Sequence, residues 1–169
     1  VKSVLVVSPK SLVSQWEREI TRWNDNGTKF AVISKETLRR DAKKLPAYEA
    51  VIIDEVHMAF GNHKSQTFKA MLGYLKAHNP QCLWILTGTP FTATSWSVYS
   101  YGLLLGKAWK WHDWKREFFY DVRMGQRLIP QPKAGKEKHL QTIIRSLGTV
   151  IDLKDVADVV DDEDIIESF

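Results

Sequence analysis

The hydrophobic positions of residues 1–88 follow two alternating periods. Short runs rich in Val, Ile and Ala predict buried strands, and longer segments with apolar residues every three or four positions predict amphipathic helices. Strand and helix alternate along this part of the chain, which is the pattern of a parallel sheet covered by helices on both faces, so we predict an α/β fold. The expected strands are 4–8, 30–34, 50–54 and 82–88, and the expected helices are 11–23, 36–45 and 64–78.

From residue 96 onward the pattern changes, because tryptophan and phenylalanine crowd a mostly helical stretch. Aromatic residues at helical spacing usually face a core, so we expect Trp109, Trp111 and Trp114 to pack inside the protein rather than to stack on unpaired bases. Further along we expect a basic loop with Pro and Gly, a short helix and an edge strand, at 124–139, 139–147 and 149–153 respectively.

These changes divide the chain into three parts. We predict a sheet-bearing core (1–95), a helical, aromatic-rich insertion with the basic loop (96–148), and a return strand with an acidic terminal segment (149–169). All three are read as parts of one domain, because 169 residues are short for two.

Composition and charge narrow the class of protein. The 44% hydrophobic and 26% charged content is that of a soluble globular protein, and the single cysteine excludes an internal disulfide and a Cys-cluster zinc site. The chain starts without the pattern of a signal peptide and has no long apolar run, so we expect a cytosolic protein without a membrane partner. Residues 152–169 carry a net charge of −7 and the remaining residues +11, and a basic body suits DNA or RNA.

The strongest chemical signal is a pair of carboxylates at the end of a buried strand. Asp54 and Glu55 follow the run AVII, and ligands of open α/β sheets bind at this edge. One carboxylate there can hold Mg²⁺ through water, and its neighbour can orient the water that attacks a phosphate. Because the next strand ends in Thr87, Gly88 and Thr89, we expect the two strand ends to share one nucleotide site. The plainer interpretation is an acidic helix cap.

Other kinds of catalytic site find no support in the motifs. The five histidines lack metal-ligand spacing, no HExxH is present, and no GxSxG elbow marks a serine nucleophile. The phosphate-binding pattern GxxxxGK[ST] is also absent. The segment 102–108 is similar to it, but it is one residue short, ends in alanine and lies in a helical stretch.

Four runs together resemble a known family. VLVVSPKSLVSQWEREITRW, FAVISKETLRRD, VIIDEVH and LTGTP are similar, in this order, to motifs Ia, Ib, II and III of the first RecA-like lobe of superfamily-two helicases. The similarity is greatest to the Swi/Snf-type DNA translocases, including small bacterial and phage members. It implies a P-loop NTPase lobe, a three-layer sandwich with a mostly parallel sheet, here without its N-terminal strand and Gly-Lys-Thr loop.

The resemblance also implies roles for individual residues. Asp54 corresponds to the residue that positions Mg²⁺ through water, Glu55 to the base that activates the water attacking ATP, and His57, in this DEAH-like motif, to the histidine that couples motif II to motif III. The coupling partners in motif III are Thr87, Gly88 and Thr89. The positions that match contacts to the DNA backbone are Ser8, Pro9, Lys10, Ser11 and Ser34.

Small hydroxyls and a lysine suit phosphate contacts. They fit turn and capping chemistry equally well, with Ser11 as the N-cap of the first helix.

Three functions stay open on the sequence. The first is part of an ATP-dependent translocase on double-stranded DNA, with a second RecA-like lobe in cis. It would be cytoplasmic in a bacterial or phage-infected cell, or nuclear in a eukaryote. The second is a non-catalytic module that binds nucleic acid or protein, derived from a helicase lobe. The third is another motor of the superfamily, such as a restriction-complex motor or an RNA helicase. Under the first, we expect the isolated chain to be inactive and its strand 82–88 to lie at a sheet edge.

Overall fold

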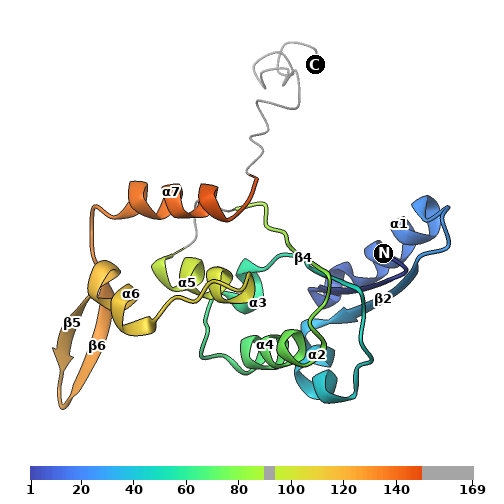
Figure 1. The fold of residues 1–169 in the computed structure, drawn as a ribbon. Coiled ribbons are helices and arrows are strands. Elements are labelled where there is room, and N and C mark those ends of the chain that lie inside the picture. Colours follow the sequence, from blue (N-terminus) through green and yellow to red (C-terminus); the bar gives the residue numbers. More distant parts are fainter. Residues whose placement is uncertain (90–93, 150–169) are drawn as a thin grey trace, which may run out of the picture.

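A four-stranded parallel sheet forms the core of the computed structural model, which describes residues 1–89 and 94–149. The strand order is β2-β1-β3-β4 (Figure 1), which confirms the α/β prediction and is compatible with a RecA-like lobe. In chain order the elements are β1 (Ser3–Ser8), η1 (Lys10–Leu12), α1 (Val13–Trp23), β2 (Lys29–Ser34), α2 (Lys35–Asp41), η2 (Ala42–Lys44), β3 (Ala50–Ile53), α3 (His57–Phe60), α4 (Gln66–His78), β4 (Cys82–Ile85), α5 (Ser95–Leu104), α6 (Trp111–Phe118), β5 (Phe119–Met124), β6 (Arg127–Pro132) and α7 (Glu137–Leu147).

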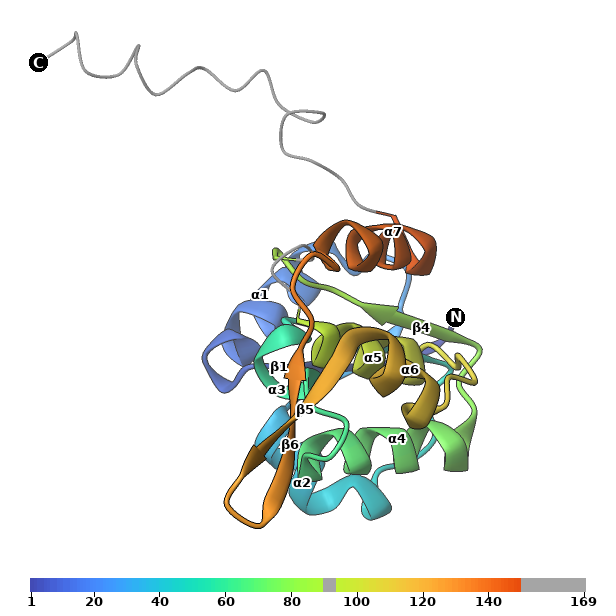
Figure 2. The same cartoon turned by 90° about the vertical axis from the view of Figure 1, so that its left-hand side faces the viewer.

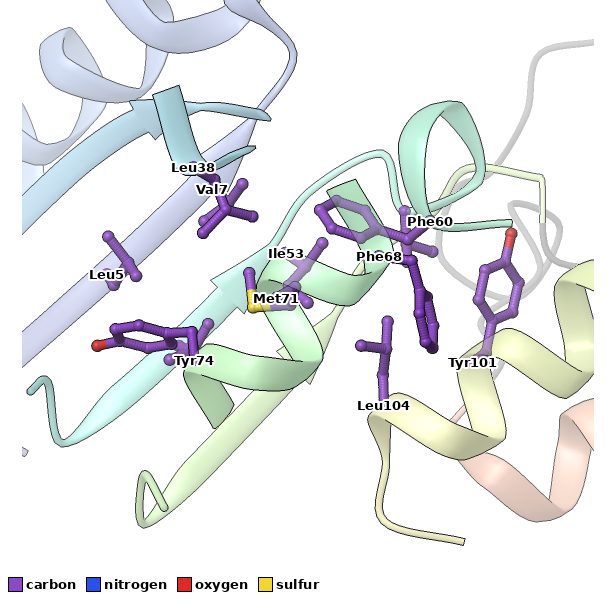
Figure 3. Packing of buried hydrophobic residues seen from close by; sticks show 12 residues of the cluster. Leu5, Val7, Leu38, Ile53, Phe60, Phe68, Met71, Tyr74, Tyr101 and Leu104 are labelled. Carbon is purple, nitrogen blue, oxygen red and sulfur yellow. The ribbon is translucent and has the colours of Figure 1, made fainter. Parts of the chain in front are cut away.

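The two faces of the sheet are covered by different helices. Side chains alternate along β1, so Leu5 and Val7 belong to the larger cluster with residues of α2 and α4, whereas Val4 and Val6 belong to the smaller cluster with Trp16 of α1. Figure 3 shows the larger cluster, in which α4 lies over the sheet and Tyr101 and Leu104 of α5 lie beside Phe68. The face toward α1 is covered less completely, since no residue of α1 is fully buried.

The start of α1 differs from the prediction. Ser11 was expected to cap this helix, but it lies inside the short 3-10 turn η1, and α1 begins at Val13 without a side-chain cap. The N-cap position belongs to Leu12 because the chain already turns helically at Lys10. The expected capping role of Ser11 is therefore wrong.

The predicted basic loop at 124–139 is also wrong for most of its length. Residues 119–124 and 127–132 pair as an antiparallel hairpin, β5–β6, with Gly125 at positive φ (62°) in its turn. The hairpin lies below α6 on the side of the molecule remote from the sheet (Figure 1), and Figure 2 views the molecule from that side. Two prolines in β6 favour a loop by local preference, but a two-stranded ribbon has no inner strand, so proline is tolerated there. The insertion at 96–148 is consequently not all helical.

Aromatic side chains form the second core of the molecule, as predicted for the tryptophans. Trp114 is buried and donates its indole N–H to the Ser95 carbonyl at 2.9 Å, while Trp109 and Trp111 pack against the same cluster. His63 lies among the rings of Trp96, Tyr99 and Trp111. Burial lowers the pKa of His63, and the charges of Lys64 and Lys69 lower it further.

Gly102 permits this aromatic packing, and its replacement provides a stability test. A Cβ at Gly102 would overlap the six-membered ring of Trp109. We expect Gly102→Ala to destabilise the chain by about 1–3 kcal/mol in urea unfolding, because overpacking outweighs the gain in helix propensity. Gly73 of α4 is the matched control, since a Cβ there meets nothing within 4 Å, and Gly73→Ala should stabilise by about 0.5–1 kcal/mol. Equal effects of the two changes would contradict the packing.

The strand β4 lies at one edge of the described sheet, as expected. Trp84 and Leu86 are 48% and 41% exposed there. The return strand predicted at 149–153 and the acidic segment fall almost wholly on residues 150–169, outside the described residues. Within the described part of the chain, no helix has the length and apolar character needed to cross a membrane.

Candidate functional site at the carboxyl ends of β3 and β4

The acidic pair lies where the prediction placed it, at the carboxyl end of β3. The strand pairs in parallel with β1 and β4, and the Asp54 N–H continues the ladder by donating to the Val7 carbonyl at 2.9 Å. On the other side the Leu86 N–H donates to the Ile53 carbonyl at 2.8 Å. Asp54 and Glu55 are both half-buried. The sheet therefore fixes the backbone that carries the two carboxylates.

Glu55 has an unusual backbone conformation. Its φ is +46°, in the left-handed region that residues with a side chain rarely occupy, at a cost of about 1–3 kcal/mol. Two hydrogen bonds hold the turn, since the Val56 N–H donates to the Leu86 carbonyl at 3.0 Å and the Glu55 carbonyl accepts from the Met58 N–H at 2.9 Å. The chain passes here from β3 into the short helix α3, which the sequence did not predict. Such strain is often found at functional sites.

His57 connects the end of β3 to the segment after β4. Its Nδ1 lies 3.0 Å from the hydroxyl oxygen of Thr87. The Thr87 oxygen also accepts the Thr89 N–H at 3.2 Å and lies 3.5 Å from the Thr89 hydroxyl, with the exposed Gly88 between them. The predicted proximity of His57 to Thr87 is therefore present, and Thr89 is joined to Thr87. Pro90 of the LTGTP run lies outside the described residues.

The carboxylate of Glu55 is close to His57 but is not hydrogen-bonded to it. Glu55 Oε2 lies 3.1 Å from His57 Nδ1, out of line for a hydrogen bond, and this oxygen is buried without a hydrogen-bonding partner. Because Nδ1 faces a carboxylate and a hydroxyl oxygen, the tautomer with the proton on Nδ1 is favoured, and that N–H donates to Thr87. A buried carboxylate oxygen that accepts no hydrogen bond is costly, so the protein leaves the hydrogen-bonding capacity of Glu55 Oε2 unused.

Trp16 is the residue of this site that sequence reasoning missed. Its indole N–H donates to Asp54 Oδ2 at 2.8 Å, and the Glu55 N–H donates to Asp54 Oδ1 at 2.9 Å. In the sequence Trp16 is only one of the residues of the predicted helix 11–23. One feature of the sequence could have indicated this contact. Trp16 lies near the start of a helix that follows a strand, and such helices begin at the carboxyl edge of a parallel sheet, where Asp54 also lies.

The residues matched to nucleic-acid contacts are not equally accessible. Ser8 is 1% exposed and donates its hydroxyl to the Pro9 carbonyl at 3.3 Å, and Pro9 is buried as well. Lys10 and Ser11 are exposed. Ser34 is the N-cap of α2, its hydroxyl oxygen accepting the Thr37 N–H at 3.1 Å. A surface contact at this edge therefore falls on Lys10 and Ser11.

The site fits a magnesium ion held through water. Each oxygen of Asp54 accepts one hydrogen bond from the protein and keeps a lone pair for a water molecule. Among the described residues, no group of three or more His, Cys, Asp or Glu side chains could enclose a metal ion.

Comparison with known proteins gives two distant relatives. The chain is 27% identical over 169 aligned residues to transcription termination factor 2 of Drosophila melanogaster, with 85% of the chain covered. It is 30% identical over 162 aligned residues to the DNA repair and recombination protein RAD54-like of Drosophila ananassae, with 75% covered. The chain spans only 15% and 20% of the lengths of these two relatives. No protein-family model matches it.

Proposed function

We propose that this chain is part of an ATP-dependent DNA translocase or helicase-like enzyme and carries its catalytic carboxylates. One observation carries the proposal: the contact of His57 with Thr87 joins the DEVH run to the LTGT run beside a buried oxygen of Glu55 that accepts no hydrogen bond. The distant likeness to a DNA repair and recombination protein and to a transcription termination factor supports a helicase-family origin and DNA as the partner.

In the proposed reaction, Glu55 takes the proton. A water molecule hydrogen-bonded to the Glu55 carboxylate attacks the γ-phosphorus of ATP, the bond from that phosphorus to the bridging oxygen breaks, and the water proton passes to the carboxylate. ADP and inorganic phosphate are the products. Asp54 would hold Mg²⁺ through water, and the ion when bound would neutralise phosphate charge.

His57 and Thr87 would transmit the state of the nucleotide site. The His57 N–H holds the Thr87 hydroxyl, which in turn accepts the Thr89 N–H, so a shift of Glu55 or His57 on hydrolysis changes the segment after β4. In the proposal this segment and a second lobe respond to ATP. Lys10 and Ser11, exposed at the same edge of the sheet, would contact the phosphates of double-stranded DNA without reading its sequence.

DNA-stimulated ATP hydrolysis by the complete gene product, compared with that of chain 1–169, tests the proposal. We expect turnover that rises with duplex DNA for the complete product and no measurable turnover for 1–169, because these residues contain no GxxxxGK[ST] loop to hold the triphosphate. Release of phosphate, measured with and without DNA, gives the turnover of the complete product and of chain 1–169. If the complete product binds DNA without hydrolysing ATP, the protein is a non-catalytic binding module and the proposal is wrong. Robust turnover by 1–169 would contradict the need for a second part.

A further inference from the structure

A hydrogen bond joins α1 to the acidic pair across 38 positions of the sequence. The indole N–H of Trp16 donates to Asp54 Oδ2 at 2.8 Å. Asp54 is the residue to which the proposed function gives Mg²⁺, whereas Trp16 belongs to none of the motif positions with an assigned role. The ring of Trp16 also packs against the smaller hydrophobic cluster, which contains Val4, Val6 and Ala50.

The fold explains why these two residues meet. Side chains on β3 alternate between the faces of the sheet, so Ala50 and Ile52 lie on the α1 face and Asp54, the next residue in that series, is directed to the same face. The helix α1 follows β1, the neighbour of β3, with Val7 opposite Ile53. Trp16 lies near the start of α1, at the carboxyl edge of the sheet, and its ring spans the gap to the carboxylate.

The two donors together fix the orientation of the carboxylate. Asp54 Oδ1 accepts a hydrogen bond from the backbone N–H of the next residue, Glu55, and Oδ2 accepts one from the indole N–H of Trp16. Without the indole, one oxygen is released and the carboxylate can rotate about its Cβ–Cγ bond. A planar indole held by a hydrophobic cluster loses little rotational freedom on forming this bond, so it is well suited to hold a charged partner in place.

We propose that Trp16 is a positioning residue for Asp54, which it orients toward a hydrated divalent cation. The mechanistic meaning of this inference rests on the proposed function, although the hydrogen bond itself does not. Hydrogen-bonding partners of metal-binding groups typically contribute about 10–100-fold to metal affinity or activity. Trp16 thus connects α1, which directly follows the turn η1 with the exposed Lys10 and Ser11, to the carboxyl edge of the sheet.

Trp23 provides a matched control on the same helix. Its indole N–H also donates to a carboxylate, Glu19 Oε2 at 2.8 Å, but this pair lies on the surface and Trp23 is 68% exposed. Trp16→Phe and Trp23→Phe therefore each remove one indole–carboxylate bond from α1. Only the first removes a bond to the proposed magnesium site.

The first measurement follows the indole signals of ¹⁵N-tryptophan-labelled chain 1–169 by NMR, with Trp16 assigned through Trp16→Phe. Asp54→Asn keeps Trp16 in place but removes the charge of its acceptor, so we expect the Trp16 signal to move upfield by several tenths of a ppm while the Trp23 signal stays. Glu19→Gln should move the Trp23 signal instead. A Trp16 signal that does not respond to Asp54→Asn would overturn the inference, whether or not the protein hydrolyses ATP.

The second measurement is the Mg²⁺ dependence of ATP hydrolysis by the complete gene product. We expect Trp16→Phe to raise the Mg²⁺ concentration for half-maximal rate about 10-fold or more, while Trp23→Phe leaves it unchanged. A merely structural role of Trp16 would lower the yield of active protein without changing this Mg²⁺ dependence. Wild-type Mg²⁺ dependence in Trp16→Phe would overturn the inference and leave the proposed function intact. Absence of hydrolysis in the wild type contradicts the proposed function, while the NMR measurement still decides the hydrogen bond.

Discussion

Glu55→Gln is expected to abolish ATP hydrolysis by the complete gene product while sparing ATP binding. Glutamine has nearly the shape of glutamate and can still accept a hydrogen bond from water, but its amide cannot take the proton. Loss of a general base costs about 10²–10⁴-fold in rate. Single-turnover hydrolysis measures the loss, and calorimetric titration with ATP measures the binding that should remain.

A surface glutamate controls for the change of charge. Glu17 lies on α1 and is exposed, so Glu17→Gln removes one negative charge without touching the carboxyl edge of the sheet. Glu17→Gln should hydrolyse ATP at the wild-type rate. If Glu55→Gln also retains hydrolysis within a few-fold of wild type, Glu55 is not the base, and the buried oxygen it presents has another use.

Phe68→Ala should have the largest effect on stability among single core changes on α4. The ring is 1% exposed and packs with the β3 side of the sheet, Phe60 and the α5 residues shown in Figure 3. Phe→Ala in a core typically costs about 3–5 kcal/mol, because apolar contacts are lost and a cavity is left. Since the free energy of unfolding of a small domain is only about 5–15 kcal/mol, this loss is a large fraction of the total.

Urea unfolding of chain 1–169, followed by tryptophan fluorescence, measures this loss. Leu128 at the hairpin is 64% exposed and gives a control of similar chemistry, since Leu128→Ala should change stability by less than about 0.5 kcal/mol. A loss below about 1 kcal/mol for Phe68→Ala would show that the cluster of α4, α5 and the sheet is not the main core.

Local pattern was sufficient for the sheet and its flanking helices. Runs of β-branched residues set the four strands, and helical spacing set α1, α2 and α4, because both signals come from neighbouring residues that must bury one side of a single element. The hairpin β5–β6 was not predicted, because it depends on pairing with a partner strand and not on a local signal. Its prolines and glycine are typical of loops, and only pairing with a partner strand, which the register provides, turns those residues into a ribbon.

The candidate site divides in the same way. The sequence shows directly that a strand is followed by the acidic pair and the histidine, and that the threonines come after the next strand. The structure shows the proximity of His57 to Thr87. The left-handed conformation of Glu55 could not be read, because glutamate has no preference for positive φ and the hydrogen bonds from Val56 and Met58 impose it. Burial of Ser8 likewise depends on what covers the end of β1.

The sequence by itself determined which residues are the candidates for the site, since a carboxylate pair after an apolar strand is a property of consecutive positions. The tertiary structure alone decided how those residues are held. Strand order and register place α1 over the same face of the sheet as Asp54, and this brings Trp16 to its carboxylate from 38 positions away. No periodicity along the chain encodes such a contact, because it depends on which strands are neighbours and on which face each side chain lies.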